Sequence, residues 1–216
     1  MRDHSHDNEH HGEVTRGHVI HWAPVYEAVF GRFLRRTHRA VVELAALQSG
    51  ERVLDVACGT GSLTLALKVA VGPAGSVHGI DASPQMIELA RRNQTGSAAD
   101  VDFQAGVAEE LRFPDGTFDV IVSQLAIHHL PDDLKQSAFA EMYRVLKPAG
   151  RCLIVDFEPP KSAVGSFIGR LLLGPVMMRT NVRNYGVLME NAGFKEVRTG
   201  GTGYALLSFV RGCAEK

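Results

Sequence analysis

The sequence lacks the features that mark three large classes of protein. Its 216 residues include 3 cysteines and no CxxC pair, which argues against a disulfide framework or a structural zinc site and fits a reducing cytoplasm. Lys and Arg number 23 against 24 Asp and Glu, so the net charge of −1 gives no bulk attraction to nucleic acid. No segment reaches the ~18 consecutive apolar residues of a membrane span. We therefore expect a soluble cytoplasmic protein whose partner is a small molecule.

The first residues differ in composition from the rest of the chain. Residues 1–13 (MRDHSHDNEHHGE) are charged and rich in histidine, where a secretory signal would be apolar. Clustered imidazoles in a flexible chain bind transition metals only loosely. We predict that this head is disordered and that the protein uses no functional metal.

From residue 51 onward, short β-rich segments alternate with helical patterns. That alternation is typical of an α/β fold, in which helices cover both faces of a parallel sheet. The predicted strands are 52–57, 76–81, 100–104, 118–123 and 151–157. The helices predicted between them run from about Leu63 to Val71, from the N-cap Ser83 and Pro84 onward, and from near Pro131 through Leu146.

The C-terminal part has a different pattern. A helix predicted at 183–192 ends at Gly193 and is followed by two β-like segments, 194–199 and 203–210. The intervening Gly200-Gly201 is prone to turn, so we expect an antiparallel hairpin at the edge of the sheet.

A glycine-containing loop follows the first predicted strand. Small residues from Ala57 to Gly61 let backbone approach a ligand, and the next helix offers unpaired N–H groups. No GK[ST] follows, which excludes a phosphate-binding loop, and the third glycine of a dinucleotide fingerprint would fall at Thr64. Asp81 ends the second strand, twenty residues beyond Gly61, where an acid can accept both hydroxyls of a ribose. The alternative is a helix cap before Ser83.

Four segments of this chain resemble the successive motifs of class I S-adenosylmethionine-dependent methyltransferases, especially the UbiE-like quinone-biosynthesis group. They are DVACGTG, GIDASPQMIELAR, AEELRFPDGTFDVIVSQLAIHHL and RVLKPAGRCLIVDF, all within about residues 50–157. WAPVYEAVFG (22–31) is also similar to the opening of bacterial phosphatidylethanolamine N-methyltransferases. The resemblance implies a Rossmann-like seven-stranded sheet of order 3-2-1-4-5-7-6 with an antiparallel last strand. It also implies lid helices in 14–50, a methyltransferase domain in 51–216 and an acceptor insert at 158–182.

The resemblance further implies which residues bind the methyl donor. Asp55, Ala57, Gly59 and Gly61 would surround the methionine part, Asp81 would hold the ribose, Ala82 and Met86 would pack on adenine, Ala108 would offer its backbone N–H, and Gln124 would lie beneath the sulfonium. Two positions depart from the family pattern. Ala57 replaces the first glycine, and Val107 stands where many members have an Asp that accepts from the adenine amino group. Losing that hydrogen bond should cost ~0.5–1.5 kcal/mol of donor affinity.

Methyl transfer from a sulfonium depends mainly on alignment and the exclusion of water, so it requires few catalytic side chains. A base matters where the acceptor must lose a proton. His129 and His128 follow the fourth predicted strand, at the edge where such folds bind ligands, and His129 is the first candidate. The alternative is that one histidine caps the Pro131 helix and the other faces solvent.

Two segments are candidates for contact with the acceptor. Within a predicted helix at about 24–47, Tyr26 is a third catalytic candidate as a lid residue, or a core aromatic, and His21 and Trp22 just precede it. The insert carries Phe167, Leu171 and Met177 in an apolar stretch that could line a pocket, dip into a membrane surface or pack as a helix on the sheet. Arginines 32, 35, 36 and 39 form a stripe that is either a solvated face or a contact for anionic lipid headgroups.

Together these patterns predict a methyltransferase that uses S-adenosylmethionine, releases S-adenosylhomocysteine and acts on a small hydrophobic acceptor. A phospholipid headgroup N-methyltransferase and a noncatalytic donor-binding protein remain alternatives, and a dehydrogenase would have to bind NADH instead. The acceptor atom and the oligomeric state stay open at this point.

Overall fold

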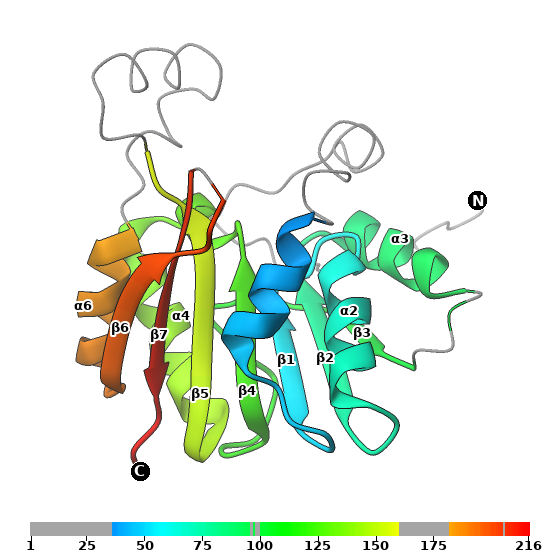
Figure 1. The fold of residues 1–216 in the computed structure, drawn as a ribbon, viewed down its shortest axis with the longest axis horizontal. Helices are drawn as coiled ribbons and strands as arrows, with labels where there is room; N and C mark the ends of the chain where they lie inside the picture. Colours follow the sequence, from blue (N-terminus) through cyan, green and yellow to red (C-terminus); the bar gives the residue numbers. More distant parts are fainter. Residues whose placement is uncertain (1–35, 96, 98–99, 160–181, 205) are drawn as a thin grey trace, which may run out of the picture.

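The fold is a single mixed β-sheet with helices on both faces. A computed structural model describes residues 36–95, 97, 100–159, 182–204 and 206–216. Within these residues the strands lie in the order β3-β2-β1-β4-β5-β7-β6 (Figure 1), which confirms the order implied by the family resemblance. The strands are β1 (Arg52–Val56), β2 (Ser76–Asp81), β3 (Asp102–Ala105), β4 (Phe118–Gln124), β5 (Leu146–Phe157), β6 (Lys195–Gly201) and β7 (Leu207–Cys213).

The pairing of the strands determines where a ligand can bind. β1 pairs in parallel with both β2 and β4, and β7 runs antiparallel between β5 and β6. In Figure 1 the arrowhead of β4 points up and that of β7 points down. The chain builds one half of the sheet outward from β1 and then the other half outward from β4. The carboxyl ends of β1 and β4 therefore flank the switch point, where open α/β sheets form their ligand crevice.

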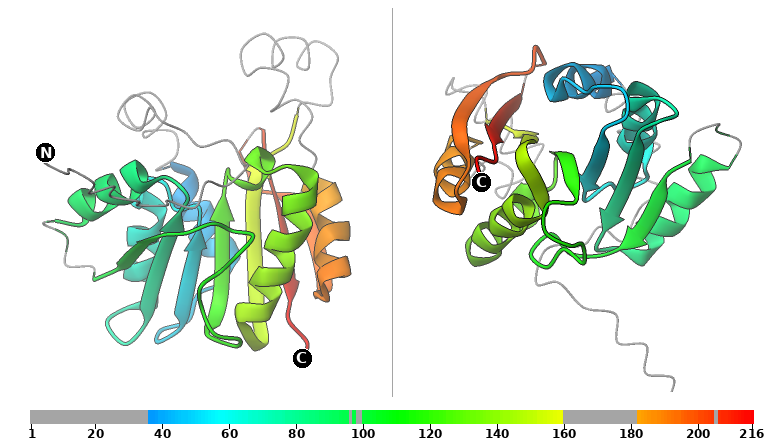
Figure 2. Two further views of the ribbon diagram at one scale, coloured as in Figure 1. Left: turned by 180° about the vertical axis from the view of Figure 1, so that it is seen from behind. Right: turned by 90° about the horizontal axis from the view of Figure 1, so that it is seen from below.

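Helices cover the two faces unequally, as the views in Figure 2 show. A helix over 36–45, α2 (Ser62–Val71) and α3 (Pro84–Gln94) contribute to one apolar cluster, whereas α4 (Asp132–Val145) and α6 (Val182–Ala192) contribute to the other. Neighbouring strand residues enter different clusters: Val53 packs on the first face and Leu54 on the second. Burial on both faces explains why β1 and β4 read as nearly continuous apolar segments.

Some local signals identified the elements correctly. Ser83 is the N-cap of α3, because its Oγ accepts a hydrogen bond from the Met86 N–H at 3.3 Å. Gly193 follows α6 with φ +106°, in the left-handed region that often ends a helix. The predicted strand at 151–157 lies within β5, which begins earlier, at Leu146, directly after α4. The assignment of Leu146 to the helix is therefore wrong.

The turn predicted at Gly200-Gly201 is also wrong. Both glycines lie within β6, and the chain reverses between Gly201 and Leu207. A Cβ at Gly200 would lie 2.8 Å from the ring of Phe209, its partner in β7. A close approach of a cross-strand aromatic ring, rather than turn formation, requires the glycine.

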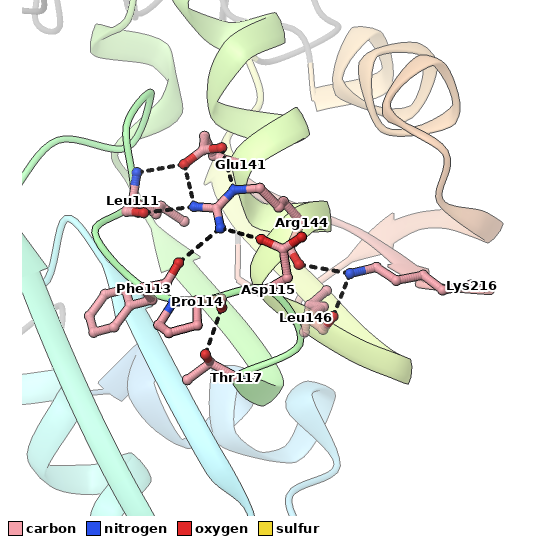
Figure 3. Close-up of polar contacts among 9 residues, drawn as sticks. All are labelled: Leu111, Phe113, Pro114, Asp115, Thr117, Glu141, Arg144, Leu146 and Lys216. Carbon is pink, nitrogen blue, oxygen red and sulfur yellow. Dashed lines mark hydrogen bonds and ion pairs between the residues drawn. The ribbon is translucent and has the colours of Figure 1, made fainter.

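Arg144 fastens the loop that leads into β4 to helix α4. Its guanidinium donates to the carbonyl oxygens of Leu111 and Phe113 and to the carboxylates of Asp115 and Glu141 (Figure 3). Glu141 in turn accepts the Leu111 N–H at 2.8 Å. The hydrogen bond from Arg144 lowers the pKa of Glu141, so the pair stays ionised. The network holds the loop that connects β3, at the site edge, with β4.

We expect Arg144→Met to destabilise the fold. The variant keeps much of the side-chain volume but leaves two carbonyl oxygens without their charged donor, which should cost about 2 kcal/mol and lower Tm by roughly 4–8 °C. Thermal unfolding followed by circular dichroism measures the change. Arg92→Met is the matched control, because Arg92 forms an exposed i,i+4 pair with Glu88. Equal Tm values for the two variants would show that the Arg144 network contributes no more to stability than the exposed Arg92–Glu88 pair.

Candidate active site

The residues that the sequence predicts to bind a ligand lie at the carboxyl edge of the sheet. The loop after β1 carries Ala57, β2 ends at Asp81, and β4 ends at Gln124. Val107 and Ala108 follow β3 at the same edge, where the Gly106 N–H donates to the Asp81 carbonyl oxygen at 3.0 Å. Val107 and Met86 are buried, whereas Ala82 and Ala108 are half-buried. Parallel strands thus bring together residues that lie far apart in the chain.

The loop after β1 adopts a backbone conformation that favours glycine. Ala57, Gly59 and Gly61 have φ values of 59°, 54° and 77°. A Cβ at Gly61 would lie 2.7 Å from the Phe103 ring, so that position excludes a side chain. A Cβ at Gly59 would meet nothing within 4 Å, so the loop borders open space there. Ala57 adopts the left-handed region at a cost of about 1–2 kcal/mol, and strain of this kind clusters at functional sites.

Asp81 is hydrogen-bonded to this loop, and its carboxylate can still accept hydrogen bonds from a ligand. Its two carboxylate oxygens accept the Gly59 N–H at 2.9 Å and the Ser83 N–H at 2.8 Å. Burial raises the pKa of Asp81, and the two N–H donors oppose that rise. Each carboxylate oxygen can accept a further hydrogen bond, which suits the paired hydroxyls of a ribose. The N-cap of α3 is Ser83 and not Asp81. Asp81 nevertheless accepts the Ser83 N–H and so fixes the backbone in front of α3.

Asp55 is buried beneath the same loop. Its carboxylate accepts a hydrogen bond from the Thr64 hydroxyl at 2.7 Å. Burial raises the pKa of Asp55 to about 7, while the Thr64 hydrogen bond lowers it and the neighbouring Asp81 charge raises it. A positively charged ligand nearby would favour the ionised carboxylate. Asp55 therefore suits a site for a cation.

Two histidines follow β4, and the structure distinguishes them. They lie in a 3-10 turn, η1 (Ile127–His129). His128 Nδ1 lies 2.6 Å from Asp156 Oδ1, and the side chains of this pair are 3% and 0% exposed. The backbone N–H of His128 also donates to Asp156, at 3.0 Å. His129 is half-buried, and its ring centroid lies 3.9 Å from that of His128.

Asp156 is the centre of a buried network. Besides both groups of His128, it accepts the Phe157 N–H at 2.8 Å and the Tyr185 hydroxyl at 3.2 Å. An imidazole that donates from Nδ1 to Asp156 keeps Nε2 as an acceptor. His128 neither faces solvent nor caps α4 through its side chain.

Sequence reasoning missed Asp156 and Tyr185. A signal for Asp156 was present, because it is the one acidic residue near the end of the apolar segment RCLIVDF. Tyr185 carried none, since it lies in α6 and meets Asp156 only through the fold.

Several predicted residues lie outside the described part of the chain. They are His21, Trp22, Tyr26, Phe167, Leu171 and Met177. Of the arginine stripe, Arg36 and Arg39 are described and exposed, and Arg39 pairs with Glu43 at 2.8 Å. Among the described residues, no group of three or more His, Cys, Asp or Glu side chains could hold a metal ion, and no helix there is both long and apolar enough to cross a membrane.

Known proteins resemble this chain in both sequence and fold. The Methyltransferase domain family matches residues 53–150. The demethylmenaquinone methyltransferase of Thermus thermophilus is 36% identical over 160 residues, which cover 72% of this chain and 71% of that protein. The ubiquinone/menaquinone biosynthesis C-methyltransferase UbiE of Saccharophagus degradans is 40% identical over 125 residues, 57% of this chain and 49% of that protein, so the chain spans about half of its length.

A solved structure shares the architecture. The crystal structure of a SAM-dependent methyltransferase from Aquifex aeolicus matches with a TM-score of 0.69 and 24% identity, over 82% of this chain and 89% of that one. This likeness concerns the fold.

Asp55 should make stability depend on pH. Its pKa is about 7 in the folded protein against an ordinary 3.8, so the folded state binds the proton more tightly. The resulting stabilisation is complete below about pH 4 and is lost as the pH rises through about 7, a change on the order of 2–4 kcal/mol. Urea unfolding at pH 5 and pH 8 measures it. Asp55→Asn should lose less stability than the wild type between these pH values, and an equal loss would contradict the assignment.

Proposed function

Because the chain belongs to the class I S-adenosylmethionine-dependent methyltransferases, in the UbiE-like group, we propose that it methylates a small hydrophobic acceptor of the quinol type, at carbon. The observation that carries the proposal is the carboxyl edge of the sheet, where a glycine loop held by Asp81 follows β1 and the buried His128–Asp156 pair lies at the ends of β4 and β5. The names of the relatives, a demethylmenaquinone methyltransferase and a ubiquinone/menaquinone C-methyltransferase, supply the acceptor class.

The residues at this edge fit S-adenosylmethionine. The open space beside Gly59 and the spare acceptor capacity of Asp81 are what a nucleoside requires. When bound, the donor supplies a methyl group activated by a positively charged sulfur. Asp55 would offset that charge, Asp81 would hold the ribose, and Ala82, Met86 and Ala108 would contact adenine. Val107 is buried and apolar, so it offers no side-chain acceptor for the adenine amino group.

His128 is our candidate for the base. A quinol ring carbon becomes more nucleophilic when a ring hydroxyl loses its proton, and His128 can take that proton at Nε2. Asp156 holds Nδ1 and stabilises the imidazolium that forms, as in other His–carboxylate pairs. We place His128 ahead of His129 for this reason. Tyr26 and the insert at 158–182 remain our proposed contacts for the acceptor, with the apolar insert also a candidate for contact with a membrane surface.

The proposal is tested by the release of S-adenosylhomocysteine with a panel of acceptors. The panel contains a short-chain demethylmenaquinol, simple phenols, thiols, amines and vesicles of phosphatidylethanolamine. We expect turnover with the quinol and methylation at a ring carbon, identified by mass spectrometry. Turnover with the vesicles alone would establish the headgroup N-methyltransferase instead, and donor binding with no transfer to any acceptor would favour a noncatalytic role.

Asp81→Ala should weaken donor binding by ~1–3 kcal/mol, because it deletes a charge-assisted contact and releases the Gly59 N–H. Calorimetric titration with S-adenosylmethionine measures the loss. Asp102→Ala is the matched control, since Asp102 is an exposed acid at the amino end of the neighbouring strand β3. Unchanged affinity in Asp81→Ala would show that the ribose assignment is wrong.

His128→Ala should lower kcat ~10²-fold or more and remove the rise of rate with pH that a base produces. Asp156→Asn should also lower kcat, because an amide cannot stabilise the imidazolium. His129→Ala is the comparison that separates the two histidines, and we expect the smaller effect there. A pH–rate profile unaltered by His128→Ala would contradict the assignment of the base, and loss of the profile in His129→Ala alone would transfer the role.

A further inference from the structure

The first described turn of helix 36–45 carries two buried polar side chains. Thr37 is 1% exposed and His38 is 7% exposed, although polar residues of this kind are mostly exposed in proteins. The Gln124 amide nitrogen donates to the Thr37 hydroxyl at 2.7 Å, and His38 Nδ1 lies 3.4 Å from the hydroxyl of Ser62. Gln124 is the last residue of β4 and Ser62 is the first of α2, so this turn contacts both sides of the switch point.

The described part of this helix is held near both Arg36 and Ala45. The Tyr204 hydroxyl donates to the carbonyl oxygen of Arg36 at 2.5 Å, beside Thr37. At the other end, Arg151 of β5 donates to the carbonyl oxygens of Ala45 and Ala46 at 2.7 and 2.8 Å. Partners from distant parts of the chain therefore fix the position from which Thr37 reaches Gln124. Such a constraint allows one hydroxyl to set the orientation of another side chain.

Gln124 occupies a position where its orientation matters. It ends β4 beside β1, and the next residue, Leu125, has φ 54°, a strained value for a branched side chain. The terminal torsion of a glutamine amide has a broad energy minimum, so the amide is not oriented by its own rotamer preference. The hydrogen bond to Thr37 engages the amide nitrogen and leaves the amide oxygen as an acceptor at the other corner of the group.

We propose that Thr37 is a positioning residue for methyl transfer, because its hydroxyl fixes the orientation of the Gln124 amide at the β1–β4 switch point. The amide oxygen, which is partially negative, then keeps one fixed position beside the reacting groups. The amide does not have to be ordered again in each turnover, which lowers the cost of aligning those groups. This inference rests on the proposed function. It makes helix 36–45 a part of the reaction site as well as a cover for the sheet.

The test compares Thr37→Val with Thr37→Ser in the full-length chain. Valine keeps the shape of threonine and removes the hydroxyl, whereas serine keeps the hydroxyl and removes the methyl group. Thr117→Val is the matched control, because the Thr117 hydroxyl bonds the Pro114 carbonyl oxygen at the amino end of β4, away from the site edge. Each variant is measured for kcat, KM, calorimetric affinity for S-adenosylmethionine, and Tm. Both Thr37 substitutions are repeated in a Gln124→Ala background.

We expect Thr37→Val to lower kcat roughly 10-fold and Tm by only about 2–4 °C, as the loss of one hydrogen bond predicts, and Thr37→Ser to stay within about 3-fold of the wild type. In the Gln124→Ala background the valine substitution should have no further effect, because the group it orients is gone. Wild-type kcat in Thr37→Val, equal losses in the valine and serine variants, or additive losses with Gln124→Ala would each overturn the proposal. If Thr37→Val fails to fold, full activity of Thr37→Ala at a reduced Tm would overturn it as well.

The outcome for the proposed function is separate. A wild-type enzyme that methylates the quinol while Thr37→Val matches it contradicts the positioning role alone. A wild-type enzyme that binds S-adenosylmethionine and methylates no acceptor contradicts the proposed function. In that case the affinity for S-adenosylmethionine tests the role of Thr37. An affinity in Thr37→Val equal to that of the wild type would overturn the positioning role.

Discussion

The parallel pairing of β1 with β4 is the constraint on which the site depends. Its register aligns Asp55 with Val122, so the glycine loop leaves β1 where β4 is about to end at Gln124. Helices diverge from the two strands toward opposite faces, and the carboxyl edge between them is left to loops and side chains. Among the described residues, those proposed here to contact the methyl donor or the reacting groups lie at or after the carboxyl end of β1, β4 or a neighbouring strand. A shift of this register would separate the donor loop from Gln124 and both histidines.

The two fully buried carboxylates at this edge have different surroundings. Burial is the largest influence on the pKa of Asp55 and raises it to about 7, while the Thr64 hydroxyl donates to this carboxylate. Asp156 is fully buried as well, but four donor groups surround it, among them the imidazole of His128. In our proposal Asp55 lies near the positive charge of the methyl donor, and Asp156 lies beside the imidazolium that His128 would form. Four hydrogen bonds offset the cost of burying Asp156, and the Thr64 hydroxyl offsets part of the cost of burying Asp55.

Local signals in the sequence predicted what depends on neighbours in the chain. Ser83 before Pro84 predicted a helix start, which the structure confirms, because that pattern acts over a single turn. The spacing from Gly61 predicted that Asp81 ends a strand, and β2 does end there. The pairing of His128 with Asp156 spans 28 residues and requires the β4–β5 register, which periodicity does not encode. Gly200 was misassigned for a related reason: its neighbour Phe209 lies across a strand pair. The residue types in the sequence indicated candidate site residues, whereas the order and pairing of the strands determine which of these residues are in contact.

The segment from Gln124 to His128 connects the contacts on the two faces of the sheet. Thr37 holds its first residue from the face covered by helix 36–45, and Asp156 holds its last residue among the side chains of α4 and α6. Between them Leu125 packs on the first face and Ile127 on the second, so the segment crosses the sheet edge. The strained φ of Leu125 makes this crossing possible, and the Leu125 N–H remains bonded to the Val155 carbonyl oxygen at 2.8 Å. An in-line displacement tolerates little misalignment. A short strained segment held from both faces therefore suits the place that we propose for it, between the methyl donor and the base His128.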